Sequence, residues 1–308
     1  MVKTAFIFPG QGSQYVGMGK DLYEGSTAAK LLFDKADETL GFPISRICFE
    51  GPDEVLKQTK NTQPAIFLHS IVLFHLISNK QFEMTAGHSL GEYSALVAAG
   101  ALTFEDGLKL VRLRGELMQK AGVENPGTMA AIVGLDSKSV NALCVEASAD
   151  GIVQAANFNS PRQIVVSGSS AGVQKAMEIA KTRGAKIVKE LPVSGAFHSP
   201  LMDSARAGLK AALDKTEIQN ALVPVYANVT ARPVRFAEEI RHLLTRQLIS
   251  PVKWEESVVN MIADGAATFV EIGPGKVLQG LVKRIDGNVK TRGFEKLSDI
   301  VDYKCESV

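Results

Sequence analysis

Gly87-His88-Ser89-Leu90-Gly91 fits the pattern G-x-S-x-G, in which a serine occupies a tight turn between a strand and a helix. The glycines on both sides leave room for the strained backbone of such a turn. A β-compatible run precedes the serine and a helical run follows it, so the free N–H groups at the helix start would lie beside Ser89. We interpret Ser89 as a candidate nucleophile next to an oxyanion site. The bare five-residue pattern also occurs in ordinary strand–helix junctions.

A serine hydroxyl needs a neighbouring base to become a good nucleophile. His198 is the candidate, because it lies in a small and apolar segment directly before Ser199-Pro200, a pair that favours the start of a helix. No acid that would orient the imidazole is evident, since Asp203 falls inside the following helix and need not face back. A backbone or amide carbonyl could orient it instead. The other histidines adjoin the serine or lie inside predicted helices: His69, His75, His88 and His242.

Arg114 is a cation in an apolar environment. It lies in a predicted helix that begins after Thr103, and apolar residues stand three, four and seven positions from it: Leu110, Val111, Leu117, Met118 and Ala121. An unpaired buried guanidinium is costly and cannot be neutralised, so Arg114 needs a carboxylate partner. The pattern leaves two interpretations open. It slightly favours an internal ion pair, and the alternative is a bidentate clamp for a substrate carboxylate.

Two glycine-rich loops invite a nucleotide interpretation that their spacing excludes. The loop after the first predicted strand, at residues 9–14, breaks G-x-G-x-x-G because Tyr15 occupies the third glycine position. Gly273-Pro274-Gly275-Lys276 lacks the Walker spacing and continues with Val277, where a magnesium ligand is required. The first loop remains a candidate for a backbone oxyanion hole, which we expect to combine the N–H groups of Gln11 and Leu90.

The composition is that of an ordinary globular enzyme. The chain has 308 residues, 45% of them hydrophobic and 22% charged, with a net charge of +1. This balance gives no electrostatic reason to expect nucleic acid as a partner. Three scattered cysteines, Cys48, Cys144 and Cys305, form no disulfide or metal pattern and favour a reducing compartment. We see neither a signal peptide nor a membrane span, and therefore expect a cytoplasmic protein. Because no metal-ligand pattern is evident, we expect no bound metal.

The middle of the chain predicts a separate unit. Strands and helices alternate there as β-α-β-β-α-β, the ferredoxin-like order, over residues 128–135, 137–148, 152–157, 163–167, 171–183 and 185–191. We therefore predict an α/β fold in which residues 1–125 and 196–308 form a large catalytic domain and residues 126–195 form an inserted subdomain. His198 would lie at the junction of the two, where ligand sites are common.

Five longer segments together resemble malonyl-CoA:acyl carrier protein transacylases, in the order and spacing of that family and over nearly the whole chain. They are Phe8-Pro9-Gly10-Gln11-Gly12-Ser13-Gln14, Gly87-His88-Ser89-Leu90-Gly91-Glu92-Tyr93-Ser94-Ala95, Arg112-Leu113-Arg114-Gly115, Gly195-Ala196-Phe197-His198-Ser199-Pro200-Leu201-Met202 and Glu271-Ile272-Gly273-Pro274-Gly275. The resemblance implies an α/β-hydrolase-like large domain that carries a ferredoxin-like subdomain, in agreement with the pattern of elements.

The resemblance also implies roles for individual residues. Ser89 would be acylated, His198 would be its base, and Arg114 would bind the malonyl carboxylate. The backbone N–H groups of Gln11 and Leu90 would form the oxyanion hole. The carbonyl of Gln247 would orient the histidine. Phe197 would crowd the α-carbon of the acyl group and so favour malonyl over methylmalonyl. Gln63 and Asn159 lie in segments that approach the site in this family.

The implied activity is transfer of malonyl from malonyl-CoA to the phosphopantetheine thiol of acyl carrier protein, by a ping-pong mechanism that supplies fatty acid synthesis. It implies no tightly bound cofactor, no nucleic acid or membrane partner, and a monomer. Alternatives are a trans-acting polyketide acyltransferase, a serine thioesterase or hydrolase, and a non-catalytic carrier-binding module. An acidic carrier would dock on a basic rim, for which Lys186, Lys189 and Lys283 are candidates.

Overall fold

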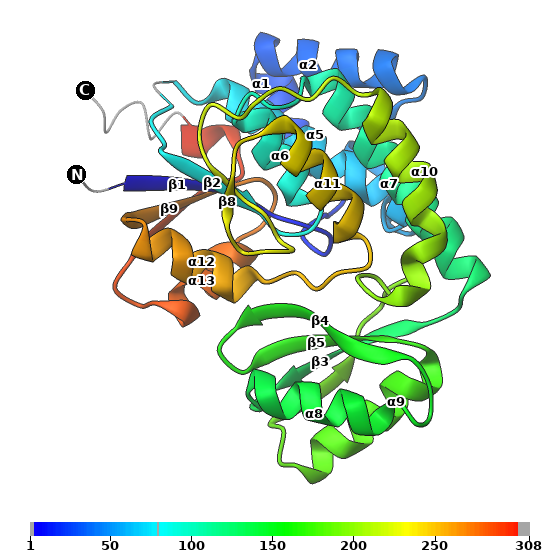
Figure 1. Cartoon of the computed structure of the whole chain (residues 1–308). Helices are drawn as coiled ribbons and strands as arrows, with labels where there is room; N and C mark the ends of the chain where they lie inside the picture. Colours follow the sequence, from blue (N-terminus) through cyan, green and yellow to red (C-terminus); the bar gives the residue numbers. More distant parts are fainter. Residues whose placement is uncertain (1–2, 79, 301–308) are drawn as a thin grey trace.

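The computed structural model describes residues 3–78 and 80–300, which form two sheets with their own helices (Figure 1). The larger sheet has the strand order β10-β9-β1-β2-β7-β8. Its neighbours are parallel except β8, which runs antiparallel to β7. The strands are β1 (Lys3–Phe8), β2 (Met84–Gly87), β7 (Val225–Tyr226), β8 (Pro233–Val234), β9 (Ala266–Ile272) and β10 (Lys290–Phe294).

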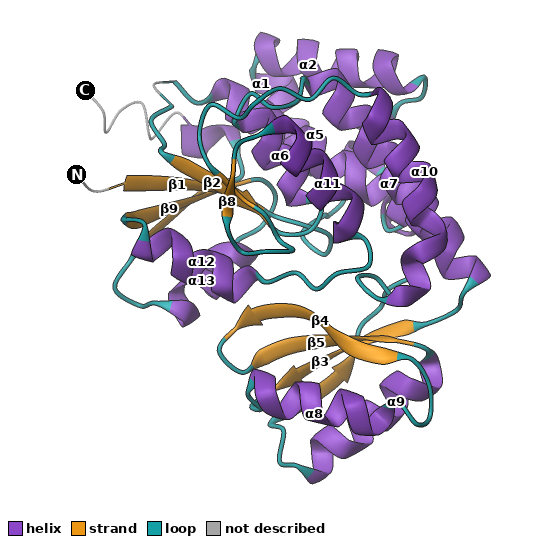
Figure 2. Cartoon of the chain, viewed as in Figure 1, coloured by secondary structure: helices purple, strands orange, loops and turns teal. Residues whose placement is uncertain are grey.

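Strand β1 shows why this sheet is covered on both faces. Successive side chains of a strand point to opposite faces, and those of β1 are apolar on both. Ala5 and Ile7 pack in one core with α12 (Trp254–Ala263) and α13 (Val277–Ile285), whereas Phe6 and Phe8 belong to a second core on the other side. Figure 2 shows the resulting three layers of helix, strand and helix.

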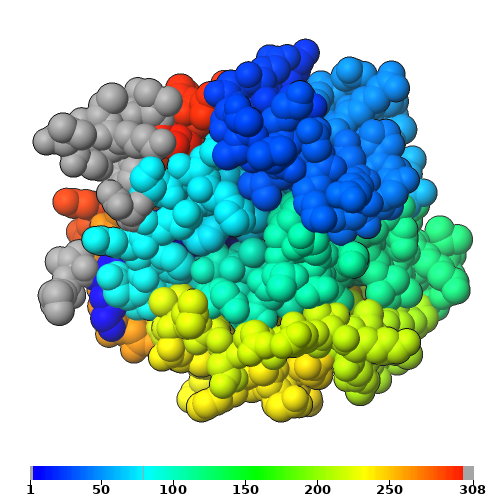
Figure 3. Space-filling view, turned by 90° about the horizontal axis from the view of Figure 1, so that it is seen from above, coloured from blue at the N-terminus to red at the C-terminus, as the bar shows by residue number. Residues whose placement is uncertain are grey.

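The second core holds most of the remaining helices. Helix α5 runs through it and is buried along most of its length. Seen from above in Figure 3, the N-terminal helices, in blue, and the region of residues 200–250, in yellow, lie on opposite sides of a band coloured cyan to green. The helices are α1 (Lys20–Gly25), α2 (Thr27–Leu40), α3 (Ile44–Glu50), α4 (Asp53–Leu56), α5 (Thr59–Leu76), α6 (Gly91–Ala98), α7 (Phe104–Glu124), α10 (Asp203–Lys215) and α11 (Ala237–Gln247), with a 3₁₀ turn at Pro200–Met202.

The smaller sheet confirms the predicted ferredoxin-like arrangement. Its strand order is β4-β5-β3-β6 and all of its neighbours are antiparallel. Helices α8 and α9 share a separate apolar core with this sheet, and Figure 1 shows them on the face that points away from the large sheet. The elements are β3 (Thr128–Val133), α8 (Ser137–Ala147), β4 (Val153–Ser160), β5 (Gln163–Gly168), α9 (Ser170–Thr182) and β6 (Ile187–Glu190). The domain boundaries at residues 125 and 196 stay a prediction.

The smaller sheet is attached to the rest of the chain along its edge strand β4. The N–H of Phe158 donates to the carbonyl of Val252 (2.9 Å), and the N–H of Val252 donates to the carbonyl of Ala156 (2.8 Å). Arg284 of α13 also donates to the Gln163 side chain at 2.5 Å. The first two bonds hold β4 and the third holds β5, so together they fix the smaller sheet beside the large one, and the candidate site lies between the two.

Two further predictions concern the cysteines and the absence of a membrane-spanning segment. Cys48 and Cys144 are buried free thiols, and Cys305 lies outside the described residues. No helix in the described part of the chain combines the length and the apolar character that crossing a membrane requires.

Candidate active site

The predicted turn around Ser89 is present, and its two glycines are needed for steric reasons. Strand β2 ends at Gly87, α6 begins at Gly91, and Ser89 between them has a positive φ of 51°. A Cβ on Gly87 would lie 1.9 Å from the backbone carbon of Gly91, and one on Gly91 would lie 2.1 Å from the carbonyl oxygen of Phe8. Because both contacts are with backbone, neither position accepts a side chain without moving the strands.

Asn228, just beyond β7, holds this turn from the neighbouring strand. Its Oδ1 accepts the N–H of Ser89 (2.6 Å), and its Nδ2 donates to the carbonyl of Gly87 (2.7 Å). One amide therefore satisfies a donor and an acceptor on either side of His88, which helps to hold Ser89 in its left-handed conformation. No sequence motif marks Asn228, and β7 follows β2 only after a long separation in the chain, so its role could not be predicted from the sequence.

His198 reaches Ser89 as a general base would. Its Nε2 lies 2.8 Å from Ser89 Oγ, and its Nδ1 lies 2.9 Å from the carbonyl oxygen of Gln247. A carbonyl accepts only, so it selects the tautomer with the proton on Nδ1 and leaves Nε2 free to accept. Burial, and then the charge of Arg114, lower the pKa of His198 to about 3. Asp203 instead pairs with Arg206 on the surface and takes no part.

Arg114 is 1% exposed and has no carboxylate oxygen within 4 Å in the described part of the chain. Its Nη1 donates to Gln63 Oε1 (2.7 Å), and its Nη2 donates to Gln247 Oε1 (2.9 Å) and Ser89 Oγ (3.0 Å). The internal ion pair that the residue pattern slightly favoured is therefore wrong. Neutral oxygens orient the guanidinium, no anion is in direct contact with it, and its Nε has no hydrogen-bond partner among the described residues. Such a group suits an anionic ligand at Ser89.

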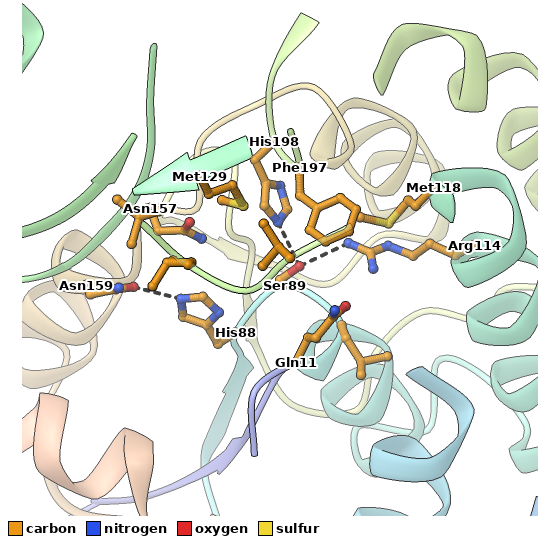
Figure 4. Close-up of a pocket in the computed structure, with 14 residues that line it drawn as sticks. Gln11, His88, Ser89, Arg114, Met118, Met129, Asn157, Asn159, Phe197 and His198 are labelled. Carbon is orange, nitrogen blue, oxygen red and sulfur yellow. Dashed lines mark hydrogen bonds between the residues drawn. The ribbon is translucent and has the colours of Figure 1, made fainter. Parts of the chain in front are cut away.

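Ser89, Arg114 and His198 line one cavity of about 180 Å³ between the two sheets (Figure 4). Its wall combines these polar groups with apolar side chains, among them Met118, Met129 and Phe197. Asn159 reaches it from β4 and contacts His88, with 2.9 Å between Asn159 Oδ1 and His88 Nε2. The lining residues are Gln11, His88, Ser89, Leu90, Arg114, Met118, Met129, Asn157, Asn159, Val165, Leu191, Val193, Phe197 and His198.

The structure thus brings together every residue that the sequence singled out for the site. Gln63 and Gln247 do not line the cavity, but both are fully buried behind it and hold Arg114 through their side-chain oxygens. No group of three or more histidine, cysteine or acidic side chains suited to a metal ion occurs among the residues that the structure describes.

Comparison with known proteins agrees with this geometry. The family model described as an acyl transferase domain matches residues 5–292. A malonyl CoA-acyl carrier protein transacylase of Bacillus subtilis (strain 168) is 50% identical over 294 residues, which cover 94% of this chain and 93% of the relative. The chain belongs to the malonyl CoA-acyl carrier protein transacylase family. The resemblance found in its motifs is thereby confirmed.

Solved structures extend the likeness of this transacylase-family chain to the whole fold. The acyl-carrier-protein S-malonyltransferase of Burkholderia pseudomallei 1710b has a TM-score of 0.93 at 42% identity, and the match covers 98% of this chain and 99% of that one. A malonyl-transacylase solved in complex with its type II polyketide synthase acyl carrier protein has a TM-score of 0.94 at 39% identity, over 97% of this chain and 98% of that one. The predicted two-sheet acyltransferase fold is confirmed.

This family member has a second buried charged residue, which was not predicted from the sequence. Glu92 is 3% exposed and lies in the first turn of α6. Its Oε2 accepts the N–H of Asn228 (3.0 Å) and Nε2 of Gln247 (2.8 Å). Burial raises the pKa of Glu92 to about 7. The available signal was the one that marked Arg114: a charged residue inside an otherwise apolar helix.

Proposed function

We propose that this chain transfers the malonyl group from malonyl-CoA to the phosphopantetheine thiol of acyl carrier protein, through a malonyl ester on Ser89. One observation carries the proposal. Arg114 is a buried cation without a carboxylate partner in the described chain, and its Nη2 lies 3.0 Å from Ser89 Oγ. A clamp for an anion beside a nucleophile suits an acyl group that ends in a carboxylate, whereas an acetyl group would leave the clamp unused.

In the first half-reaction, the malonyl carboxylate binds Arg114 and the thioester carbonyl lies at Ser89. His198 accepts the hydroxyl proton through Nε2 as Ser89 Oγ attacks the carbonyl carbon. The backbone N–H groups of Leu90 and Gln11 stabilise the oxyanion. When the tetrahedral intermediate collapses, the carbon–sulfur bond breaks, and the imidazolium returns the proton to the departing thiolate of coenzyme A.

In the second half-reaction, the phosphopantetheine thiol of the carrier takes the place of coenzyme A. His198 accepts the thiol proton, the thiolate attacks the malonyl ester, and the proton returns to Ser89 Oγ as the ester bond breaks. Gln247 keeps the imidazole in one tautomer throughout, since its carbonyl oxygen lies 2.9 Å from Nδ1. No acidic third member is required for this role.

The remaining predicted residues support this assignment in different ways. Gln63 orients Arg114 through a 2.7 Å hydrogen bond. Phe197 lines the cavity, and we propose that it disfavours a methyl branch on the acyl group. One methyl group is worth only about 1–3 kcal/mol, so this preference is a modest one. Asn159 forms part of the opposite wall.

The carrier would approach from the open side of the cavity. Lys186, Lys189 and Lys283 are exposed and stay candidates for contact with an acidic carrier. The same transfer reaction could load malonyl onto the acyl carrier protein of fatty acid synthesis or onto that of a polyketide synthase. We therefore propose to test both carrier proteins as acceptors in the transfer assay. The monomeric state and the cytoplasmic location also stay predictions.

The proposal is tested by transfer of radiolabelled malonyl from malonyl-CoA to a holo acyl carrier protein, with acetyl-CoA as the comparison substrate. We expect Ser89→Ala to be inactive. We expect Arg114→Ala to lose a factor of about 10²–10³ in malonyl kcat/KM, as loss of a buried charge-assisted contact of about 3–4 kcal/mol implies, while acetyl transfer is kept or increases.

Arg112→Ala is the matched control. Arg112 lies on the same helix but pairs with Glu116 and contacts Lys60 and Asn61, away from Ser89. It should leave the malonyl-to-acetyl ratio unchanged. Release of free malonate at the same rate with and without the carrier would instead show a hydrolase and would overturn the proposal.

A further inference from the structure

Two buried charges of opposite sign lie on either side of Gln247 without touching each other. The Oε1 of Gln247 accepts Nη2 of Arg114 at 2.9 Å, and its Nε2 donates to Glu92 Oε2 at 2.8 Å. Neither charged group forms a direct ion pair within 4 Å in the described residues. The amide is thus oriented with its oxygen toward the cation and its nitrogen toward the anion, which is the favourable alignment of its dipole.

This arrangement compensates the charge of Arg114 while the cavity holds no acyl group. A buried guanidinium without any nearby negative charge would be strongly unfavourable. Glu92 supplies that charge from within the fold, and its interaction with Arg114 opposes the effect of burial on the pKa of either group. The Glu92 side chain is also fixed in place, since the backbone N–H of Asn228 donates to the same oxygen.

A malonyl carboxylate bound to Arg114 would change this balance, because two negative charges would then share one cation. We propose that Glu92 is the counter-charge of Arg114 in the unacylated enzyme and that, through Gln247, it limits how firmly the malonyl group is held on Ser89. Glu92 is a positioning residue, since it acts on Arg114 only through Gln247. The inference rests on the proposed malonyl transfer.

Among the titratable groups near the site, Glu92 is the one whose protonation state changes near neutral pH. Arg114 from α7 and Tyr93 from α6 interact with Glu92, whereas His198 contacts Ser89 and His88 contacts Asn159. The pKa of Tyr93 is raised by burial, and the pKa of both histidines is lowered by burial, that of His198 to about 3. Burial raises the pKa of Glu92 to about 7, and a second carboxylate raises it further. We therefore expect Glu92 to take up a proton when malonyl arrives.

The test is the equilibrium constant for acylation of Ser89, measured by intact-protein mass spectrometry in mixtures of malonyl-CoA and free coenzyme A at pH 8, where Glu92 is charged before acylation. Glu92→Gln keeps the shape and the acceptor oxygen but removes the charge. We expect it to raise the malonylation constant by about tenfold, because one like-charge repulsion across a buried site is removed. The constant for acetyl-CoA should stay within about twofold, since acetyl carries no charge.

Glu271→Gln is the matched control. Glu271 is fully buried and accepts two backbone N–H groups at the start of α13, from Leu278 and Gln279, with no contact to Arg114. It should lower the melting temperature without changing either constant. If Glu92→Gln moves both constants equally or moves neither, the inference is wrong. If the wild-type enzyme is not malonylated at all, the proposed function itself fails.

Proton uptake by the wild-type enzyme gives a second measurement that needs no variant. We expect malonylation at pH 7.5, in weakly buffered indicator solution, to take up part of one proton per enzyme more than acetylation does, since both reactions release the same coenzyme A thiol. Where Glu92→Gln folds, this difference should vanish. Equal uptake for the two acyl groups in the wild-type enzyme would refute the role of Glu92.

Discussion

Asn228 offers a direct test of how the serine turn is held. Its side chain bonds the N–H of Ser89 at 2.6 Å and the carbonyl of Gly87 at 2.7 Å, and it is fully buried. Truncation to alanine removes both partners and leaves a donor and an acceptor of the turn without a bond. The backbone of Ser89, at a φ of 51°, then loses the contact that opposes its relaxation.

The magnitude follows from those two groups. A buried polar group that loses its partner costs about 1–3 kcal/mol, so Asn228→Ala should lower the free energy of unfolding by about 2–6 kcal/mol. The effect on the rate is separate. A displacement of a reacting atom by about 1 Å costs on the order of 10²-fold, and we expect a loss of that size in the rate of Ser89 acylation.

Urea unfolding measures the first quantity, and rapid-quench acylation with malonyl-CoA measures the second in the folded fraction. Asn260→Ala is the matched control, because among the described residues its side chain donates one bond, to the carbonyl of Ala231 at 2.8 Å in the loop after Asn228, and does not contact the serine turn. It should lower stability by about 1 kcal/mol and leave the rate unchanged. If Asn228→Ala acylates within threefold of the wild-type rate, the turn is held by its glycines and α6 alone, and the reasoning is refuted.

Two further predictions concern the base and the glycines. Because the pKa of His198 is lowered to about 3, the unprotonated base persists well below pH 6.5, and acylation by acetyl-CoA should stay constant from pH 7 down to about pH 5; a midpoint near 6.5 would contradict this. Gly87→Ala should lower the free energy of unfolding by at least about 3 kcal/mol, because its Cβ would lie 1.9 Å from the backbone of Gly91. Gly280→Ala, whose Cβ would meet nothing within 4 Å, should instead raise it by about 1 kcal/mol, and equal effects in urea unfolding would show that the predicted overlap is relieved.

The features that the sequence predicted well are those that depend on neighbours in the chain. The serine turn needs glycine at two nearby positions because strand and helix meet there, and the pattern shows both. The buried side of α7 follows from the spacing of apolar residues around Arg114, which is indeed among the largest fully buried side chains. The ferredoxin-like order is likewise a matter of successive local elements.

The partner of Arg114 could not be predicted in this way, because it depends on which distant residues surround the guanidinium. Gln63 comes from α5 and Gln247 from the end of α11, at sequence separations of 51 and 133 residues. The residue pattern requires a partner for the cation but does not say whether that partner lies inside the protein. Only the fold shows that amides occupy the positions next to the guanidinium, that Glu92 lies beyond one of them, and that an anion in direct contact has to come with a ligand.

Gln247 shows most clearly what the resemblance implied and what it left out. The resemblance implied a carbonyl that orients His198, and the structure has it at 2.9 Å from Nδ1. It implied nothing about the side chain, which contacts Arg114, the carbonyl of Ser89 and Glu92. One residue thus fixes the imidazole through its backbone and the guanidinium through its amide. Gln247 therefore fixes His198 and Arg114 relative to each other, and a shift of α11 would displace both relative to Ser89.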